Sequence, residues 1–380
     1  MNISQHLPNS TTNMIRTAVI MAGGSGERFW PLSRKNRPKQ LLALTSEKMM
    51  IEEAIERIKP LIPIEHIYIF TSEILQQPIR EALPNLPAEN VVAEPSKRNT
   101  APCLAFAAVF LAEKYQMPAS EISMAVLTAD HYISTLSQFV EAVDNALSYA
   151  EKNTALVTIG IPPNRPETGY GYIEISRTDD DELITPAVSF REKPTFETAL
   201  TFLKSGTFLW NSGMFFWRLD SLLDSFRTHL PEIGSKLDEL GDLLQSKTTQ
   251  VIERCIPEIK SLYGQFPDIS IDYGIMEKAG NVAVARALFL WDDVGSWDSL
   301  DRMRSQDTDG NVNTGKNVLL DTKNSTLVNT TSGQVLAAIG LEDFVVVATD
   351  DAILICPKNR AQHVRQAVAE IRRRGDEHHL

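Results

Sequence analysis

The chain has few of the features that mark secreted, membrane or metal-cluster proteins. It contains only three cysteines, and no pair follows the Cys-x-x-Cys pattern, which excludes a paired-cysteine zinc site and a disulfide framework. No apolar run reaches the roughly 20 residues that cross a bilayer. Residues 1–14 are polar and lack an apolar signal core, so we expect a flexible leader and no export. A reducing cytoplasm is the expected compartment, with no membrane partner.

Positively charged residues are also fewer than negatively charged ones. The chain carries 37 Lys and Arg against 49 Asp and Glu, a net charge of -12. This balance argues against a surface for nucleic acid or anionic lipid. Small anionic ligands remain compatible, because a local cluster of cations can bind phosphate on an acidic protein. With 43% hydrophobic residues, the chain can bury a substantial core and is not expected to be disordered.

Two familiar phosphate-binding fingerprints are missing. Counted from Gly24, the last glycine of the dinucleotide motif is replaced by Phe29, and no P-loop Gly-Lys-Ser/Thr occurs. A short apolar run, Ala18 to Met21, nevertheless ends directly in glycines. It predicts a buried strand followed by a loop whose backbone N–H groups can approach a phosphate, although an ordinary strand–turn–helix gives the same pattern. Arg28 and Lys39 follow as cations suited to a polyphosphate.

Strand-like and helix-like segments alternate through the first half of the chain. Strands are expected at Val19–Met21, Ile67–Phe70, Met124–Leu127 and Leu156–Ile159. Helical periodicity marks residues 49–59, 101–115 and 138–152. This alternation predicts an α/β fold, a doubly wound and mostly parallel mixed sheet of Rossmann-like type. Ligands of such sheets bind at the carboxyl ends of the strands.

The second half changes character. Residues 165–220 suggest a mixed extension of the sheet around a cleft, and residues 221–265 look helical and amphipathic. A polar stretch near 305–317 divides an expected first domain, 15–305, from a small β-rich domain, 306–380. The small domain is expected to contain strands Asn317–Asp321, Ser325–Val328, Phe344–Ala348 and Ala352–Ile355 and a helix over 359–373. A few turns of hexapeptide-like β-structure near 311–330 are only faintly indicated.

Several polar residues could carry chemistry, and each also has a structural explanation. Asp130 directly follows a buried strand, where a carboxylate can hold Mg²⁺ or cap a helix. Asp293 is a second carboxylate that could converge on the same cation, or form a turn. Glu174 could meet a sugar hydroxyl or lie on a hairpin edge. Lys193 could hold a monophosphate or sit in a solvated turn, and Asn211, inside an apolar strand, must bond either the backbone or a ligand.

The motifs in their order resemble one family. They read G-G-S-G-E-R-F-W-P-L-S with P-K-Q, E-P-x-x-R-N-T-A-P, A-D-H, G-Y-G-Y-I-E, E-K-P, W-N-S-G-M-F, S-I-D-Y-G-I-M-E-K and D-V-G-S-W. Together they resemble the mannose-1-phosphate guanylyltransferases of the nucleotide-sugar pyrophosphorylase superfamily, over roughly residues 15–300 and weakly beyond. The resemblance implies a nucleotidyltransferase fold, GTP and mannose 1-phosphate as substrates, GDP-mannose and pyrophosphate as products, and Mg²⁺ as cofactor.

The resemblance also implies roles for individual residues. The residues that resemble the nucleotide-binding positions are Ala22, Gly23, Gly24, Ser25, Gly26, Glu94, Pro95, Arg98, Asn99 and Thr100. Those that resemble the cations acting in catalysis are Arg28, Lys39 and Lys193. The mannose-holding positions correspond to Gly171, Glu174, Asn211 and Asp272. The metal carboxylates correspond to Asp130 and Asp293.

Other readings stay open at this point. The nearest alternative is a pyrophosphorylase that acts on another hexose 1-phosphate or another nucleotide. A non-catalytic sugar-nucleotide sensor would be expected to lose the cationic and metal positions that are present here. Many bacterial relatives continue into an isomerase domain, and because this chain ends soon after the small β region no isomerase activity is expected. Residues 310–380 could form a homodimer contact or a lid over the cleft.

Overall fold

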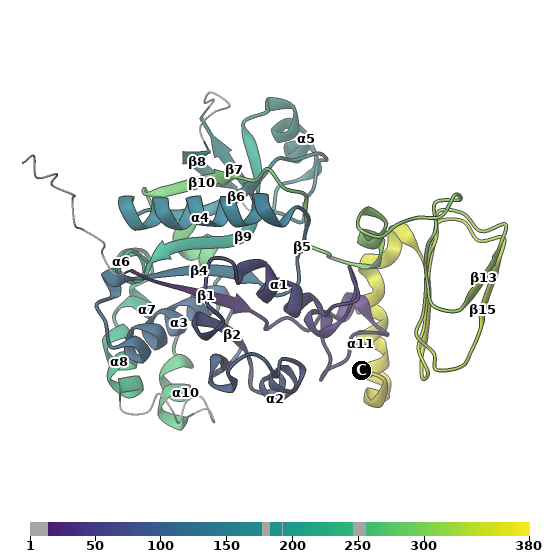
Figure 1. Ribbon diagram of the computed structural model, residues 1–380, viewed down its shortest axis with the longest axis horizontal. Coiled ribbons are helices and arrows are strands. Elements are labelled where there is room, and N and C mark those ends of the chain that lie inside the picture. Colours follow the sequence, from purple (N-terminus) through teal and green to yellow (C-terminus); the bar gives the residue numbers. More distant parts are fainter. Residues whose placement is uncertain (1–13, 177–182, 192, 246–255) are drawn as a thin grey trace, which may run out of the picture.

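The computed structural model describes residues 14–176, 183–191, 193–245 and 256–380. The expected leader therefore lies outside the described residues except for its last position. A nine-stranded mixed sheet with helices on both faces forms the larger part, and smaller sheets follow it in the chain (Figure 1). The α/β class expected from the sequence, with a small β-rich C-terminal part, is confirmed.

The first half of the large sheet is parallel, in the order β3-β2-β1-β4. Its strands are β1 (Ile15–Met21), β2 (Ile67–Ser72), β3 (Val91–Glu94) and β4 (Ile122–Thr128). Their registers pair Met21 with Thr128 and Ser72 with Glu94. The carboxyl ends of these strands consequently meet along one edge of the sheet, and the loops that leave this edge carry most of the polar motifs.

The second half of the sheet is built around antiparallel pairs. Its strands are β6 (Leu156–Ile161), β7 (Tyr172–Ile175), β8 (Ile184–Arg191), β9 (Phe208–Arg218) and β10 (Val282–Arg286). Strand β9 is long enough to pair with β4 through its C-terminal half and with β7 through its N-terminal half. It thereby ties the parallel strands to the sheet extension that the sequence predicts within 165–220.

Two groups of helices cover the two faces of the sheet (Figure 1). One face carries α1 (Met50–Ile58), α2 (Glu73–Ala82) and α4 (Leu136–Asn153). The other carries α3 (Thr100–Tyr115), α6 (Leu219–His229), α7 (Pro231–Gly234), α8 (Leu237–Gln245) and α10 (Pro257–Tyr263). Helix α3 is apolar nearly all round, which explains why it is packed between the sheet and other helices. Helix α5 (Phe196–Ser205) lies beside β9.

The C-terminal part winds its strands into two small parallel sheets. Strands β12 (Val312–Thr314), β14 (Thr326–Asn329) and β16 (Phe344–Ala348) are parallel, and β17 (Ile353–Pro357) adds an antiparallel edge. Strands β13 (Asn317–Leu320) and β15 (Leu336–Ile339) form the second sheet. From β12 to β16, successive strands alternate between the two sheets. The repeated turns of β-structure that the sequence faintly indicates near 311–330 therefore continue well beyond residue 330.

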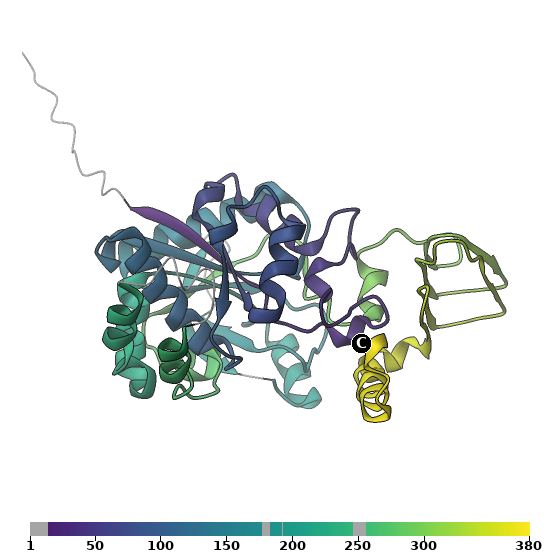
Figure 2. The same ribbon diagram turned by 90° about the horizontal axis from the view of Figure 1, so that it is seen from below.

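A 3₁₀ segment, Lys358–His363, and helix α11 (Val364–Arg374) then bring the chain back toward the large sheet. In both views α11 lies between the small sheets and the large one (Figures 1 and 2). One apolar cluster joins the two parts, with Phe29 and Trp297 packing together with Val345, Val364 and Val368. Within the described ranges, no helix combines the length and apolar character needed to span a membrane.

Candidate active site

A cavity of about 520 Å³ opens at the carboxyl edge of the parallel strands. It collects residues from the ends of β1, β2, β3 and β4 and from the start of α3. The sequence-predicted residues that line it are Gly23, Gly24, Glu94, Pro95, Asn99, Thr100 and Asp130. The fold thus brings the glycine loop and the Glu94–Thr100 segment, which are far apart in the sequence, to one cavity.

The glycine loop is held firmly at its base. The backbone N–H of Ala22 donates to the Phe70 carbonyl at 2.8 Å, and the Ala22 carbonyl accepts from Gln40 Nε2 at 2.8 Å. Gly26 has a left-handed backbone, with φ of +61°, and a Cβ there would lie 2.4 Å from Lys39 Cβ. Only glycine allows Lys39 to approach this closely. A Cβ at Gly24 would meet open space, and the Gly24 carbonyl accepts from Gln40 Nε2 at 3.3 Å.

The segment after β3 supplies polar groups to the same cavity. Glu94 accepts a hydrogen bond from the Tyr263 hydroxyl at 3.2 Å, and burial raises the pKa of its carboxyl. The Asn99 side chain caps α3 by accepting from the Thr100 N–H at 2.9 Å. Thr100 Oγ1 in turn accepts from the Ile271 N–H at 2.8 Å. The helix entry expected here is therefore present, and its residues also line the cavity.

In this segment Arg98, which is predicted to bind the nucleotide, is absent from the described lining of the cavity, and Ser96, which is not predicted, is part of it. Arg98 donates to the Phe266 carbonyl at 2.7 Å and is not among the described residues that line the cavity. Ser96 does line it, and its buried hydroxyl has no hydrogen-bond partner within the described part of the chain. Sequence reasoning gave Ser96 no role, because a serine beside a proline carries no distinctive signal.

A second, more polar cavity of about 370 Å³ adjoins the first. It is lined by residues of both charges, namely Glu27, Arg28, Lys39, Asp130, Asp293 and Arg365, with Ser25 and Gly26. Two very short antiparallel strands explain why Asp130 and Asp293 meet here. Strand β5 (Tyr132–Ile133) pairs with β11 (Trp291–Asp292), with Asp292 opposite Tyr132. This pairing draws the loop after β4 and the loop after β11 to the same place.

Lys39 lies between the two acidic residues. Its Nζ is 3.0 Å from Asp130 Oδ2 and donates to the Asp293 carbonyl at 2.7 Å, while only 6% of the residue is exposed. Burial alone would raise the pKa of Asp130, but Lys39 and His131 outweigh it and hold that pKa below its ordinary value. Burial lowers the pKa of His131 to about 4, and its Nδ1 accepts from Trp291 Nε1 at 3.1 Å. His131 is thus neutral at pH 7 and packs against Trp291.

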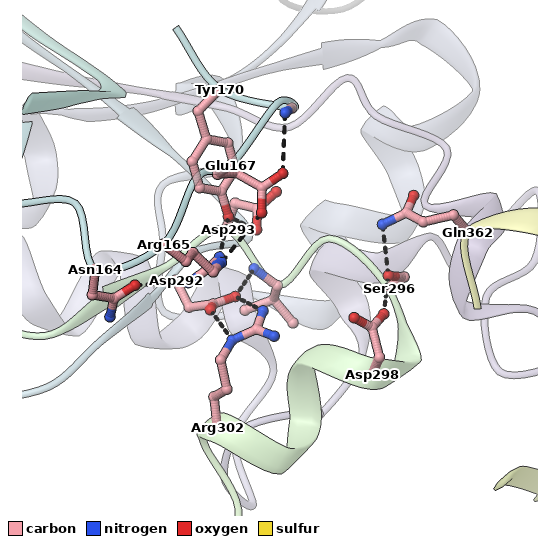
Figure 3. A network of polar contacts seen from close by, with 12 residues as sticks. Asn164, Arg165, Glu167, Tyr170, Asp292, Asp293, Ser296, Asp298, Arg302 and Gln362 are labelled. Atoms are coloured by element: carbon pink, nitrogen blue, oxygen red, sulfur yellow. Dashed lines mark hydrogen bonds and ion pairs between the residues drawn. The ribbon is translucent and has the colours of Figure 1, made fainter. Parts of the chain in front are cut away.

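Asp293 is oriented by a tyrosine. The Tyr170 hydroxyl donates to Asp293 Oδ1 at 2.6 Å, and the neighbouring Asp292 is paired with Arg302 at 2.6 Å (Figure 3). Burial raises the pKa of Asp293, and the nearby charges of Asp292 and Asp130 add to this, while the Tyr170 hydrogen bond and Lys39 oppose it. Sequence reasoning missed Tyr170, because an aromatic residue in an alternating strand reads as packing.

The donor set at this cavity suits a hard divalent cation. Asp130 and Asp293 both line it, and among the described residues an ionised Asp293 has no positive partner other than the shared Lys39. Within the described segments, no group of three or more His, Cys, Asp or Glu residues could hold a metal. A cation here would therefore rest on two carboxylates and on ligand oxygens, which is how Mg²⁺ is commonly bound.

Three of the four predicted sugar-site residues are linked to one another. Asn211 Nδ2 donates to Asp272 Oδ1 at 2.7 Å, and the Asn211 N–H donates to the Gly171 carbonyl at 2.8 Å. Tyr170, which precedes Gly171, joins this group to the acidic pair by its hydrogen bond to Asp293, and the ring centroid of Trp210 lies 5.2 Å from that of Tyr170.

Glu174 lies on β7, and Lys193 follows the neighbouring strand β8. Glu174 in β7 accepts a hydrogen bond from Ser189 of β8 at 2.7 Å. Lys193 is exposed and follows the end of β8, where Arg191 pairs with Tyr172 next to Gly171. The residue between Arg191 and Lys193 lies outside the described ranges. The topology thus brings Lys193 to the Gly171 end of β7.

The glycine loop, the acidic pair and the mixed sheet together define a nucleotidyltransferase. The family model for nucleotidyl transferases matches residues 17–310, and a β-helix domain model, described as MannoseP isomerase/GMP-like, matches residues 315–371. The chain belongs to the nucleotidyl transferase family and, within it, to the mannose-1-phosphate guanylyltransferases.

Individual relatives support this membership. A mannose-1-phosphate guanylyltransferase of Escherichia coli K12 is 38% identical over 368 residues, covering 95% of this chain and 74% of the relative. The alginate biosynthesis protein AlgA of Pseudomonas aeruginosa is 36% identical, covering 94% and 72%. A crystal structure from Thermus thermophilus, described as a mannose-1-phosphate geranyltransferase, is 34% identical with a TM-score of 0.82, covering 94% of this chain and all of that one.

Proposed function

We propose that the protein transfers GMP from GTP to α-D-mannose 1-phosphate, forming GDP-mannose and releasing pyrophosphate. The names of the relatives support this reaction. The observation that carries the proposal is the meeting of Asp130 and Asp293 at a cavity that the glycine loop also lines. A sugar-nucleotide sensor would not need this acidic pair together with Arg28 and Lys39.

The two adjoining cavities suit two different parts of the nucleotide. The larger cavity has a mostly apolar wall with a few hydrogen-bonding side chains, Glu94, Asn99 and Thr100, which suits a base and ribose. The smaller one carries Arg28 and Lys39, which suit phosphates. Because Asp130 lines both, we assign the α-phosphate to the junction between them.

The chemistry requires charge neutralisation more than proton transfer. The second pKa of a phosphate monoester is about 6, so the attacking oxygen of the sugar phosphate is already ionised at pH 7. This oxygen bonds to the α-phosphorus while the bond to the bridging oxygen of the β-phosphate breaks, and pyrophosphate leaves. Arg28 and Lys39 offset the charge of the departing pyrophosphate, and Lys193 orients the sugar phosphate. Positioning and electrostatic stabilisation supply most of the acceleration in such transfers.

The acidic pair has a role of its own in this proposal. Asp130 and Asp293 would hold Mg²⁺ together with phosphate oxygens, and the bound ion would offset negative charge at the α-phosphate. Tyr170 keeps Asp293 directed toward the cavity. Asn211 and Asp272 would bind mannose hydroxyls, and the fixed Gly171 backbone would limit how far the sugar can shift.

The test is pyrophosphate release from a matrix of nucleoside triphosphates and hexose 1-phosphates, with Mg²⁺ or with a chelator. GTP with mannose 1-phosphate should react fastest, lose turnover with chelator and regain it with Mg²⁺. Asp130→Ala should abolish the Mg²⁺-dependent turnover, whereas Asp144→Ala, which removes a surface carboxylate paired with Arg16, should not.

Each alternative to the proposed function predicts a different result of this experiment. Faster turnover of another pair would reassign the substrates. Mg²⁺-dependent turnover in Asp130→Ala would remove the metal assignment. Tight GTP binding without turnover of any pair would favour the sensor.

A further inference from the structure

The C-terminal helix α11 reaches the phosphate end of the site. Gln362, just before α11, donates from Nε2 to Ser296 Oγ at 2.8 Å, in the loop that carries Asp293 (Figure 3). Arg372, at the other end of the helix, is 3.0 Å from Glu27 beside the glycine loop. The C-terminal part is therefore fastened on both sides of the smaller cavity.

One residue of α11 lines that cavity. Arg365 is exposed and stands among its walls together with Arg28, Lys39 and the two acidic residues. The structure gives its guanidinium group no ion pair or hydrogen bond to any residue of the described ranges. A cation at a cavity wall without a protein counter-charge is available to an anionic ligand.

The other charges around the cavity show why a further cation matters. Lys39 is engaged by Asp130, and the charge of Arg372 is offset by Glu27. Arg28 reaches only the Gly295 carbonyl, at 3.4 Å, and has no carboxylate partner within the described residues. Among the cavity-lining residues that the structure describes, Arg28 and Arg365 are thus the arginines left to meet a ligand's charge.

We propose that Arg365 binds the pyrophosphate portion of the nucleoside triphosphate, so that the C-terminal part completes the phosphate site. The inference rests on the proposed function for the identity of the leaving group. Arg365 lines the cavity of Arg28 and Gly26 and not the one of Glu94 and Thr100, which places it at the phosphate end and not at the base. Because guanidinium groups bind phosphate oxygens bidentately, arginine suits this position better than lysine.

The experiment measures binding of inorganic pyrophosphate by titration calorimetry, with Mg²⁺ present, to the full-length protein. Arg365→Gln should weaken binding about tenfold, as expected for the loss of one charge-assisted contact. Arg365→Lys should restore part of the affinity. Arg373→Gln removes the same charge from the same helix, but Arg373 pairs with Glu370 on the surface, so pyrophosphate affinity should stay at the wild-type value.

Kinetics in the reverse direction give a second readout. With Arg365→Gln the KM for pyrophosphate should rise about tenfold while the KM for GDP-mannose stays constant, because GDP-mannose lacks the leaving group. Thermal melting of each variant checks that the fold is intact.

The outcomes separate this inference from the function it rests on. Wild-type affinity for pyrophosphate in Arg365→Gln, or equal weakening in Arg373→Gln, overturns the inference, and so does a wild-type protein that binds no pyrophosphate. A wild-type protein that binds pyrophosphate through Arg365 but turns over no nucleotide and sugar phosphate leaves the inference standing and overturns the proposed function.

Discussion

At the scale of single residues, Tyr170 favours the ionised form of the Asp293 carboxyl group. Its hydroxyl donates to a carboxylate whose pKa burial already raises. Tyr170→Phe keeps the ring between Trp210 and Trp291 and removes the hydroxyl, which donates to Asp293 and accepts from Arg165 Nη2 at 3.3 Å. The pKa of Asp293 should rise further, because the hydrogen bond favours the ionised form.

The expected result is a pH effect with a definite sign. If turnover needs the ionised carboxylate, the acid limb of the kcat/KM profile should move to higher pH in Tyr170→Phe. The loss near pH 7 should be about tenfold or more, since a hydrogen bond to a charged group contributes roughly 1.5–3 kcal/mol.

Tyr172→Phe is the matched control. Its hydroxyl donates to the Glu167 carbonyl at 2.9 Å, so the variant loses one hydrogen bond but touches no carboxylate of the cavity. Its acid limb should stay where the wild-type limb is. An unmoved limb in Tyr170→Phe would show that Asp293 does not titrate in the rate-determining state.

Much of the candidate site can be predicted from residue types alone. The rest depends on contacts that exist only in the folded chain, which residue types do not reveal. Glycines after an apolar strand and an aspartate after the next parallel strand predict a ligand edge, because the sheet aligns strand ends. Ser96 and Tyr170 cannot be found by such reasoning. Ser96 stands out only by a buried hydroxyl that has no hydrogen-bond partner among the described residues, and Tyr170 only by its hydrogen bond to Asp293. Arg365 is equally hidden, because it reaches the cavity only through the packing of α11 against the loop that carries Arg28.

At the scale of elements, the parallel strands and long helices follow closely from periodicity. The strand expected at Val19–Met21 lies within β1, and the helix expected over 101–115 is α3. The full length of β9 does not follow from the pattern, because Asn211 and a glycine interrupt its apolar run. The pair β5 and β11 has only two residues in each strand, too few for any pattern, yet it brings the acidic pair together.

The link between β9 and the segment that begins at Asp272 makes a prediction about substrate binding. Asn211→Ala removes the amide that holds Asp272 at 2.7 Å. If this pair binds the sugar, the KM for mannose 1-phosphate should rise about tenfold while the KM for GTP stays within about twofold, measured by steady-state pyrophosphate release.

Asn153→Ala serves as the control for that variant. Asn153 is exposed, and within the described part of the chain its side-chain amide bonds only its own helix, donating to the Tyr149 carbonyl at 2.9 Å. Neither KM should change in it. A parallel rise of both KM values in Asn211→Ala would mean that the pair supports the fold and not the sugar.

At the scale of the whole molecule, the two parts of the chain share a core. Val364 is 3% exposed in the cluster that also holds Phe29 and Trp297. Parts that bury apolar surface against each other should unfold together. Calorimetry and far-ultraviolet circular dichroism should therefore report one coincident transition.

A pair of valine variants sharpens this expectation. Val364→Ala should lower the free energy of unfolding by about 1.5 kcal/mol, two methyl groups at roughly 0.8 kcal/mol each, and should shift the whole transition. Val318→Ala, at a position 47% exposed on the small sheets, should leave it unchanged. Two separate transitions, or a shift of only one of them, would mean that the C-terminal part folds independently.

Lys39 gives the resting molecule a built-in counterion. Its ammonium group already bridges the Asp130 carboxylate and the backbone of Asp293. Two acids that would otherwise repel each other can thus be assembled before any substrate arrives. If Mg²⁺ binds as proposed, it would take over from Lys39 the neutralisation of Asp130, so that this carboxylate faces a positive charge both before and after the ion binds.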